Sequence, residues 1–265
     1  MKYSGQISKM ITSFNNPIDY HLPIVDKLLS VNDLISKKIK IEYNNQIFCI
    51  ECNKPIKKTY MQGYCYPCFL ESPKTSECIL RPHLCRAHLG ESRNVQWSKE
   101  HCLKDNYVYL SITSNLKVGV TRSSQIPTRW IDQGAHLAIK FAKTPNRYLA
   151  GMIEKEISNQ LSDRTQWRKM LKGDYDTNIN LIQEKEKLET TLSVEYREYI
   201  SKDNTVTNIK YPIDAQLEKI NSINLDKTPL VSNKLIGIKG QYLIFDNENV
   251  LNIRKYTGYI LSLSF

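Results

Sequence analysis

Apolar and polar positions form their clearest pattern between residues 105 and 175. Two short apolar runs, Val108–Ile112 and Lys117–Thr121, flank a polar turn with Ser-Asn at its tip. This pattern is typical of a β-hairpin. Pro127 stands where a first helical turn begins and Gly134 stands where such a helix stops, so a short helix is expected after the hairpin.

The same region continues with a third strand and two more helices. Residues 136–143 alternate between apolar and polar side chains, which predicts a strand. Asn146 is a suitable N-cap for a helix that runs to about Leu161, and Asp163 with Gln166 forms a capping box for a last short helix. The expected order is therefore strand, strand, helix, strand, helix, helix.

Both ends of the chain are predicted to be rich in β-structure. Lys40–Tyr43 and Gln46–Ile50 alternate like strands with one covered face, and Asn44-Asn45 between them predicts a hairpin turn. From residue 207 onward, short apolar runs separated by turn residues predict four or five strands. We expect these strands to form a small sheet or barrel that the N-terminal strands complete.

Apolar residues recur at helical spacing after residue 176, from Leu181 to Tyr199, and predict one amphipathic packing helix followed by a polar linker. The sequence thus predicts an α+β chain with β-rich N- and C-terminal parts, a cysteine-rich segment that resembles a zinc ribbon, and a small three-stranded α/β domain. The expected segments are 1–48, 49–104, 105–175, 176–206 and 207–265.

Length and composition exclude several classes of protein. The chain has 265 residues, of which 41% are hydrophobic, so a largely disordered chain is excluded. No apolar run approaches the eighteen or more residues that span a bilayer, and the N-terminus lacks the apolar block of a secretory signal. We therefore expect a cytoplasmic protein without a membrane partner.

Positive charge is concentrated in the central region. The net charge is +10, and residues 107–172 hold eleven Lys and Arg against four acidic residues. Such an excess favours an anionic partner, with DNA or RNA ahead of a membrane surface. A solvated basic face with no partner is the alternative. The residues expected to contact nucleic acid are Lys140, Lys143, Arg147, Arg164, Arg168, Lys169 and Lys172.

Four cysteines form two Cys-x2-Cys pairs, Cys49 with Cys52 and Cys65 with Cys68. Each pair can place two thiolates on one side of a tight turn, and two pairs complete a tetrahedron around zinc. Four thiolates leave no open coordination position, so a structural zinc ion is expected. A disulfide framework would need an oxidising compartment, and a redox pair would lie beside a βαβ unit, so both fit this pattern poorly.

A second group contains the remaining three cysteines and several histidines. Cys85-x2-His88 has the spacing of a metal knuckle, with Cys78 upstream and Cys102 downstream. We expect these four residues to form a second closed zinc site, with His101 as the alternative histidine ligand. The other interpretation is that the group consists of buried free thiols and surface histidines.

Four polar residues of the central region resemble the functional residues of the GIY-YIG nuclease superfamily. "YVY" (107–109) stands in place of the first motif and "KVG" (117–119) in place of the second, in the form of the divergent KIG branch. Arg129 and Glu154 occupy the places of the arginine and the glutamate. The whole chain also resembles a bacterial family that joins zinc knuckles to such a domain and has no established activity.

The resemblance implies a role for each residue in hydrolysis of a phosphodiester bond. Glu154 would bind Mg²⁺ at the scissile phosphate, and Arg129 would stabilise the charge on it with support from Arg122. Tyr109 would orient or deprotonate the attacking water. Lys117 replaces the second tyrosine and cannot act as a base unless its pKa is much lowered.

Three functions follow from these residues. The first is a zinc-containing, Mg-dependent endonuclease. The second is a DNA- or RNA-binding protein that keeps the scaffold and the zinc knuckles but does not cut. The third is a zinc-stabilised adaptor that binds other proteins.

Overall fold

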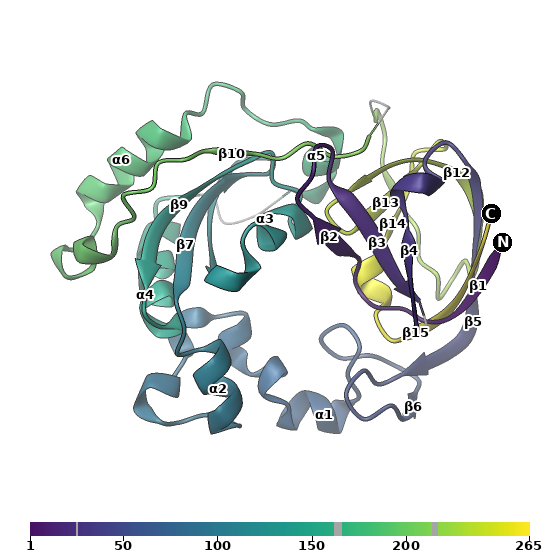
Figure 1. Cartoon of the computed structure of the whole chain (residues 1–265), viewed down its shortest axis with the longest axis horizontal. Helices are drawn as coiled ribbons and strands as arrows, with labels where there is room; N and C mark the ends of the chain where they lie inside the picture. The colour runs from purple at the N-terminus through teal and green to yellow at the C-terminus, as the bar shows by residue number, and fades with distance from the viewer. Residues whose placement is uncertain (25, 162–165, 214–216) are drawn as a thin grey trace. The chain divides into compact units, whose positions relative to one another are not determined.

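A computed structural model describes residues 1–24, 26–161, 166–213 and 217–265 (Figure 1). The chain divides into two compact units, of which unit 1 comprises residues 1–70 and 210–265 and unit 2 comprises residues 71–209. Within the described ranges, no helix is both long and apolar enough to cross a membrane. The fold is α+β, and among the described strands every pair is antiparallel except β11 with β14.

Unit 1 is built from β-strands contributed by both ends of the chain. The first and last strands, β1 and β15, pair with each other, and β15 also pairs with the long strand β5 (Figure 1). The large sheet has the order β1-β15-β5-β12-β13-β14-β11, with β6 paired to β5, and a smaller sheet has the order β2-β3-β4. The predicted completion of the C-terminal strands by N-terminal ones is confirmed.

The strands of unit 1 are β1 (Lys2–Gln6), β2 (Ile11–Ser13), β3 (Asp19–Ile24), β4 (Lys27–Ser30), β5 (Lys38–Phe48), β6 (Pro55–Ile56), β11 (Asn221–Ser222), β12 (Leu230–Lys239), β13 (Tyr242–Phe245), β14 (Asn249–Asn252) and β15 (Tyr259–Ser264). The helical elements are η1 (Asn32–Leu34), η8 (Ile253–Tyr256) and α1 (Tyr66–Glu71), whose last residue is the first of unit 2.

The hairpin predicted around Asn44-Asn45 is wrong. Strand β5 runs without a turn through both residues, and β15 pairs along its length with a register shift between Tyr43 and Ile47. Asn45 has a φ of 56°, which asparagine tolerates better than most residues. The two asparagines therefore make an irregularity inside one strand, because pairing with β15 on one side and β12 on the other favours continuation over reversal.

Unit 2 is organised around the sheet β10-β9-β7-β8. The predicted hairpin is present as β7 (Asn106–Ile112) and β8 (Leu116–Arg122), and the predicted third strand is β9 (Leu137–Thr144). A short fourth strand, β10 (Thr207–Asn208), pairs at the outer edge of β9. The β-hairpin, the short helix after it and the third strand were therefore predicted in the right order.

The helices of unit 2 are α2 (Val95–His101), α3 (Thr128–Asp132), α4 (Arg147–Ser158), α5 (Trp167–Lys172) and α6 (Leu181–Thr191). Its 3₁₀ segments are η2 (Pro73–Thr75), η3 (Glu77–Ile79), η4 (Pro82–Leu84), η5 (Ala87–Leu89), η6 (Ser123–Gln125) and η7 (Val194–Tyr199).

Helix α4 covers one face of the sheet and α3 lies on the other side of it (Figure 1). Asn146 caps α4 as predicted, because its side chain accepts a hydrogen bond from the Leu149 backbone N–H at 2.9 Å. The core between α4, α6 and the sheet is apolar and fully buried. It includes Val108, Leu110, Ile112, Ile139, Phe141, Ala150, Ile153, Ile157, Leu181 and Leu188.

Two predicted helical features differ in the structure. The amphipathic helix ends at Thr191, where the hydroxyls of Thr190 and Thr191 donate to carbonyls three residues earlier, and η7 follows it. In the capping box predicted for α5, Gln166 makes no side-chain cap hydrogen bond, and Asp163 lies outside the described residues.

Gly151 allows α4 to pack directly against η4. A Cβ atom on Gly151 would lie 2.1 Å from the backbone nitrogen of His83 and 2.3 Å from the carbonyl carbon of Pro82. Both distances are far below van der Waals contact and both involve backbone, so a side chain at this position would force the helix away from η4.

We expect Gly151→Ala to lower the stability of unit 2 by about 2 kcal/mol. Alanine gains about 1 kcal/mol of helix propensity, but overpacking against fixed backbone costs more. All three tryptophans (Trp97, Trp130 and Trp167) belong to unit 2, so denaturation followed by tryptophan fluorescence measures this unit. The control Lys155→Ala changes an exposed residue of the same helix and should stay within 0.5 kcal/mol; equal stability of the two variants would contradict the packing argument.

Candidate functional site

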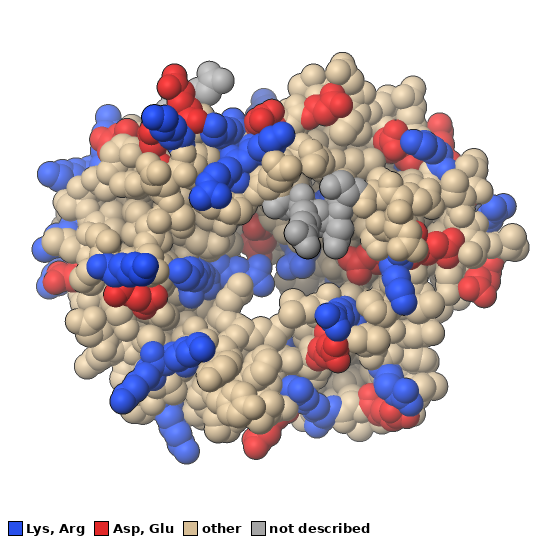
Figure 2. Space-filling view, turned by 180° about the vertical axis from the view of Figure 1, so that it is seen from behind, with Lys and Arg blue, Asp and Glu red and all other residues tan. Residues whose placement is uncertain are grey.

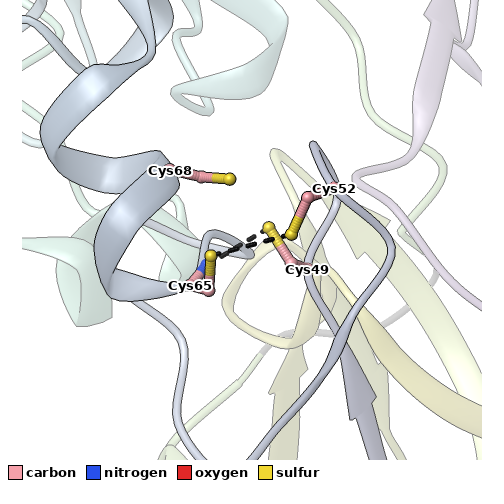
Figure 3. Close-up of side chains that lie close together, drawn as sticks. All are labelled: Cys49, Cys52, Cys65 and Cys68. Carbon is pink, nitrogen blue, oxygen red and sulfur yellow. Dashed lines mark hydrogen bonds between the residues drawn. The ribbon is translucent and has the colours of Figure 1, made fainter.

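Four cysteine sulfur atoms of unit 1 point toward a common centre (Figure 3). Cys49 and Cys52 lie in the loop that follows β5, Cys65 precedes α1, and Cys68 lies within it. All four sulfur atoms are within 4.8 Å of one another. The two Cys-x2-Cys pairs are therefore brought together as their spacing predicted.

The geometry of this four-cysteine cluster fits a tetrahedral metal ion. Zn–S bonds of ~2.3 Å imply sulfur–sulfur separations of about 3.8 Å, and the sulfur atoms of Cys52 and Cys65 are 3.8 Å apart. Four thiolates complete the coordination of zinc and leave no position for a substrate. This cluster can therefore hold a metal ion in a structural role.

Backbone N–H groups prepare Cys49 for its role as a thiolate. The N–H groups of Glu51 and Cys65 donate to its sulfur at 3.5 and 3.3 Å. Burial of this side chain opposes ionisation, but the backbone N–H groups of Cys52, Cys65 and Glu51 outweigh it and lower the pKa of the Cys49 thiol to about 6. Donors of this kind stabilise the charged form that binds metals.

The loop that carries the four-cysteine cluster is attached to the sheet of unit 1. The Ile50 N–H donates to the carbonyl of Gly63, and the Phe48 N–H donates to the carbonyl of Gly258, both at 2.9 Å. Gly258 has a φ of 94°, and a Cβ atom there would lie 2.7 Å from the Phe48 carbonyl oxygen. The turn before β15 therefore fits tightly against the base of the cluster.

The second cysteine group lies in unit 2 and consists of Cys78, Cys85 and Cys102. Their sulfur atoms are within 4.8 Å of one another, and Cys85 and Cys102 are buried. No histidine among the described residues joins them. The ring of His88 stacks on Tyr148 with centroids 4.4 Å apart, and the ring of His101 stacks on Trp97. The three cysteines were thus predicted correctly as a group, and neither histidine is placed in it.

Helix α4 begins at this three-cysteine cluster. The side chain of Arg147 donates to the carbonyls of Cys78 and Ile79 at 2.9 and 3.0 Å, and its backbone N–H donates to the carbonyl of Cys102 at 2.8 Å. Tyr148 packs against the cluster as well. Arg147, which was predicted to contact nucleic acid, therefore ties α4 to the cysteine-rich segment.

A buried tyrosine lies at the centre of the site predicted from the resemblance. Tyr109 on β7 is fully buried, and its hydroxyl donates to the side-chain oxygen of Gln133 at 2.7 Å. Its ring meets Trp130 edge to face with centroids 6.0 Å apart. On the paired strand, a Cβ atom at Gly119 would lie 2.5 Å from the tyrosine hydroxyl oxygen. Glycine is thus required at 119 for this position of Tyr109.

The charges of Arg129 and Glu154 both act on Tyr109. Burial raises the pKa of Tyr109 and the negative charge of Glu154 raises it further, while the positive charge of Arg129 acts in the opposite direction. Arg129 is on α3 and Glu154 is on α4. Residues from two different helices therefore both affect the pKa of the tyrosine on β7.

Arg122 and Lys117 occupy different surroundings from each other. Side chains alternate along a strand, so Arg122 lies on the opposite face of β8 from Lys117 and Gly119. Burial lowers the pKa of Arg122, and the charge of Arg147 lowers it further. Arg122 thus lies toward the start of α4 and the three-cysteine cluster, and the structure does not bring it to Tyr109.

Several of the predicted nucleic-acid contacts are engaged within the protein. Lys140 pairs with Asp203 at 2.9 Å and Lys143 pairs with Asp105 at 2.8 Å. On the face shown in Figure 2, Lys and Arg side chains are spread over the surface and Asp and Glu side chains lie among them. The predicted cations that remain exposed on α5 are Arg168, Lys169 and Lys172, and Arg164 lies outside the described residues.

Gln133 is a part of the site that the sequence reasoning missed. It ends α3 one turn after Arg129, and its side chain is the acceptor for the Tyr109 hydroxyl. Helical spacing places residues 129 and 133 on the same face of a helix. This i, i+4 relation to the arginine is the signal that indicates Gln133.

A profile described as "Protein of unknown function (DUF2797)" matches residues 36–261, most of the chain. The chain belongs to the DUF2797 family. The match extends over both cysteine clusters and the Tyr109 site, so all of them lie within the part that this DUF2797 protein shares with its family. No curated protein matches the chain, and no solved structure matches it.

We expect Cys65→Ser to remove one metal ion per chain and to destabilise unit 1. A ligand present at a thousand times its Kd stabilises the folded state by about 4 kcal/mol, and this contribution is lost with the site. Elemental analysis measures the metal, and calorimetry follows unfolding. The tryptophan-monitored unfolding of unit 2 serves as the internal control and should not change. A chelator should destabilise the native chain more than it destabilises the variant. Unchanged metal content in the variant would contradict the four-cysteine site.

Proposed function

We propose that unit 2 of this DUF2797 protein is a GIY-YIG-like domain that binds a nucleic-acid phosphodiester and hydrolyses it with Mg²⁺. The observation that carries the proposal is that the charges of Arg129 and Glu154 act on the same buried tyrosine, Tyr109, above Gly119. The four residues come from β7, β8, α3 and α4 in the order that the resemblance implies.

Arg129 and Glu154 supply the charged groups that this reaction needs. The guanidinium of Arg129 binds a phosphoryl oxygen and stabilises the charge that develops on it. Glu154 is one carboxylate, and one carboxylate together with substrate phosphate and waters is a usual donor set for Mg²⁺. When bound, Mg²⁺ would neutralise phosphate charge and favour ionisation of water. Its site is thus completed by the substrate.

Tyr109 acts in this proposal as a positioning residue. Its raised pKa and its burial keep the hydroxyl protonated at neutral pH, so it does not serve as the general base. Its hydrogen bond to Gln133 fixes the end of α3, the helix that carries Arg129. Tyr109 therefore does not take the proton of the attacking water, which would pass to the substrate phosphate or to solvent.

The second candidate function is binding without cleavage. The burial of Tyr109 favours it, and so does the presence of Lys117 where the active nucleases carry a tyrosine. In this case Arg129 and the exposed cations of α5 hold the phosphate backbone, and the sheet serves only as a scaffold. Fold alone does not decide between the two functions.

We also propose zinc as the metal of the four-cysteine cluster. Soft thiolate ligands in a tetrahedral arrangement select zinc over magnesium or calcium. Since nothing in a closed site reacts, its role is to hold the loop between β5 and α1 in one conformation. The location of the protein in the cytoplasm, where thiols stay reduced, is part of the same proposal.

Glu154→Gln tests the hydrolytic function. Labelled single- and double-stranded DNA and RNA are incubated with the native chain with and without Mg²⁺. We expect Mg-dependent cleavage that falls about 100-fold or more in the variant, because the amide does not bind the cation, while affinity for the nucleic acid changes less than about twofold. The control is Glu156→Gln on the same helix, whose carboxylate accepts hydrogen bonds from Ser193. Cleavage retained by Glu154→Gln contradicts the mechanism, and binding by the native chain without cleavage selects the second function.

The exposed cations of α5 test the binding surface. Each phosphate contact contributes a slope of about −0.9 to the dependence of log K on log salt concentration for duplex DNA. Replacing Lys169 and Lys172 together with alanine should reduce the slope by about 2. Lys140→Ala is the matched control, because Lys140 is paired with Asp203 and should leave the slope unchanged. A slope that depends on Lys140 and not on the α5 pair would contradict this surface.

A further inference from the structure

The three-cysteine cluster has three sulfur ligands where a structural zinc site has four. Cys78, Cys85 and Cys102 are within 4.8 Å of one another, and no histidine nitrogen or carboxylate oxygen of the described residues joins them. The spacing resembles that of the four-cysteine cluster, so a thiophilic metal ion fits between the sulfur atoms. Three protein ligands and one open position are the arrangement of metal centres that bind an exogenous ligand.

The nearest candidates for a fourth protein ligand are engaged elsewhere. His101 bonds through Nδ1 to the carbonyl of Trp97 at 2.9 Å and its ring stacks on the indole. His88 stacks on Tyr148. Glu77 and Glu91 bond to Arg81 and Arg86. These contacts hold each side chain in a conformation in which it does not join the three sulfur atoms.

A cavity reaches all three cysteines. It has a volume of about 220 Å³ and is lined by polar and aromatic side chains as well as by the sulfur-bearing residues. Trp97 and Ser98 come from α2, and Ser92 is exposed. A volume of this size accommodates a molecule of several heavy atoms. The fourth position of a metal ion at the cluster is therefore accessible to a small ligand.

The charge around the cluster favours a negative ligand. A divalent ion with three thiolates carries one net negative charge. The guanidinium of Arg147 is fixed against the cluster by its hydrogen bonds to the backbone carbonyls of Cys78 and Ile79, and a charge on Cys102 raises the pKa of Arg122, which burial lowers. Arg93 also lines the cavity, so positive groups lie beside a centre with one net negative charge and favour an anionic donor over a neutral one.

We propose that the three-cysteine cluster is an open metal centre whose fourth coordination position faces this cavity and binds a small thiolate. A thiolate combines the negative charge that the arginines favour with the soft donor that the metal prefers. The four-cysteine cluster of unit 1 is closed and takes no such ligand. The two clusters of one chain thus have different functions.

Cobalt(II) substitution tests this proposal with the full-length chain. The native protein is stripped of metal under reducing conditions, loaded with Co²⁺ and titrated with 2-mercaptoethanol, while visible absorption reports the coordination sphere. We expect two Co²⁺ per chain, of which one changes its spectrum on addition of the thiol. Cys52→Ser should remove the unresponsive ion and keep the response, and Cys85→Ser should remove the response and keep the other ion.

Two further variants separate an open site from one closed by a histidine. His88→Gln and His101→Gln should leave both the spectrum before thiol is added and the thiol response unchanged.

A third variant tests whether the ligand enters through the cavity. Ser92→Trp, at an exposed residue of the cavity, should weaken the thiol response about tenfold or more without loss of Co²⁺. The proposal is overturned if either histidine variant changes the spectrum before thiol is added, or if the native protein binds only one Co²⁺. It is also overturned if the thiol removes Co²⁺ from the protein or leaves the native spectrum unchanged.

Discussion

The packing of helix α4 against the segment between Cys78 and Cys85 is the constraint on which the rest of unit 2 depends. Gly151 lets the backbone of the helix meet the backbone of Pro82 and His83 without an intervening side chain. Arg147 bonds to two carbonyls of the same segment, and Ala150, Ile153 and Ile157 on the helix enter the core beneath the sheet. One helix thus joins the cysteine-rich segment to the sheet and also carries Glu154. Any change that moves α4 alters the charge that acts on Tyr109.

The two cysteine clusters lie in different structural surroundings. The loop that carries the four-cysteine cluster has few buried apolar residues, since α1 buries none, and so it lacks a core of its own. A metal ion held by the four sulfur atoms would replace that core, as in small domains that fold only with metal. The three-cysteine cluster instead lies beside a helix that is already held by a large apolar core. A metal ion bound there would therefore contribute less to the stability of the surrounding structure.

Fewer Lys and Arg side chains are available to bind a nucleic acid than the composition indicates. Lys140 and Lys143 form ion pairs and Arg147 holds the start of α4. Exposed ion pairs contribute little to stability, about 0–1 kcal/mol each, but they reduce the local charge that a phosphate backbone meets. Of the residues predicted to contact nucleic acid, Arg168, Lys169 and Lys172 stay exposed and outside these ion pairs, and all three lie on α5. Helix α5 belongs to the same unit as α3, the helix that carries Arg129.

Local patterns in the sequence determined the elements and the grouping of the cysteines. Strand alternation, Pro127, Asn146 and the Cys-x2-Cys spacing act over a few residues, so the β7–β8 hairpin, helix α4 and the four-cysteine cluster were predictable. Alternation along the strand also predicts that Arg122 and Gly119 lie on opposite faces of β8, although the resemblance to the GIY-YIG nucleases assigns both to one site. Tertiary structure decided what depends on distant partners. Strand β5 continues through Asn44-Asn45 because β12 and β15 pair with it. His88 and His101 stack on aromatic rings and do not join the cysteines. For β5 and His88, the conformation is determined by contacts with residues that are distant in the sequence, which local patterns do not show.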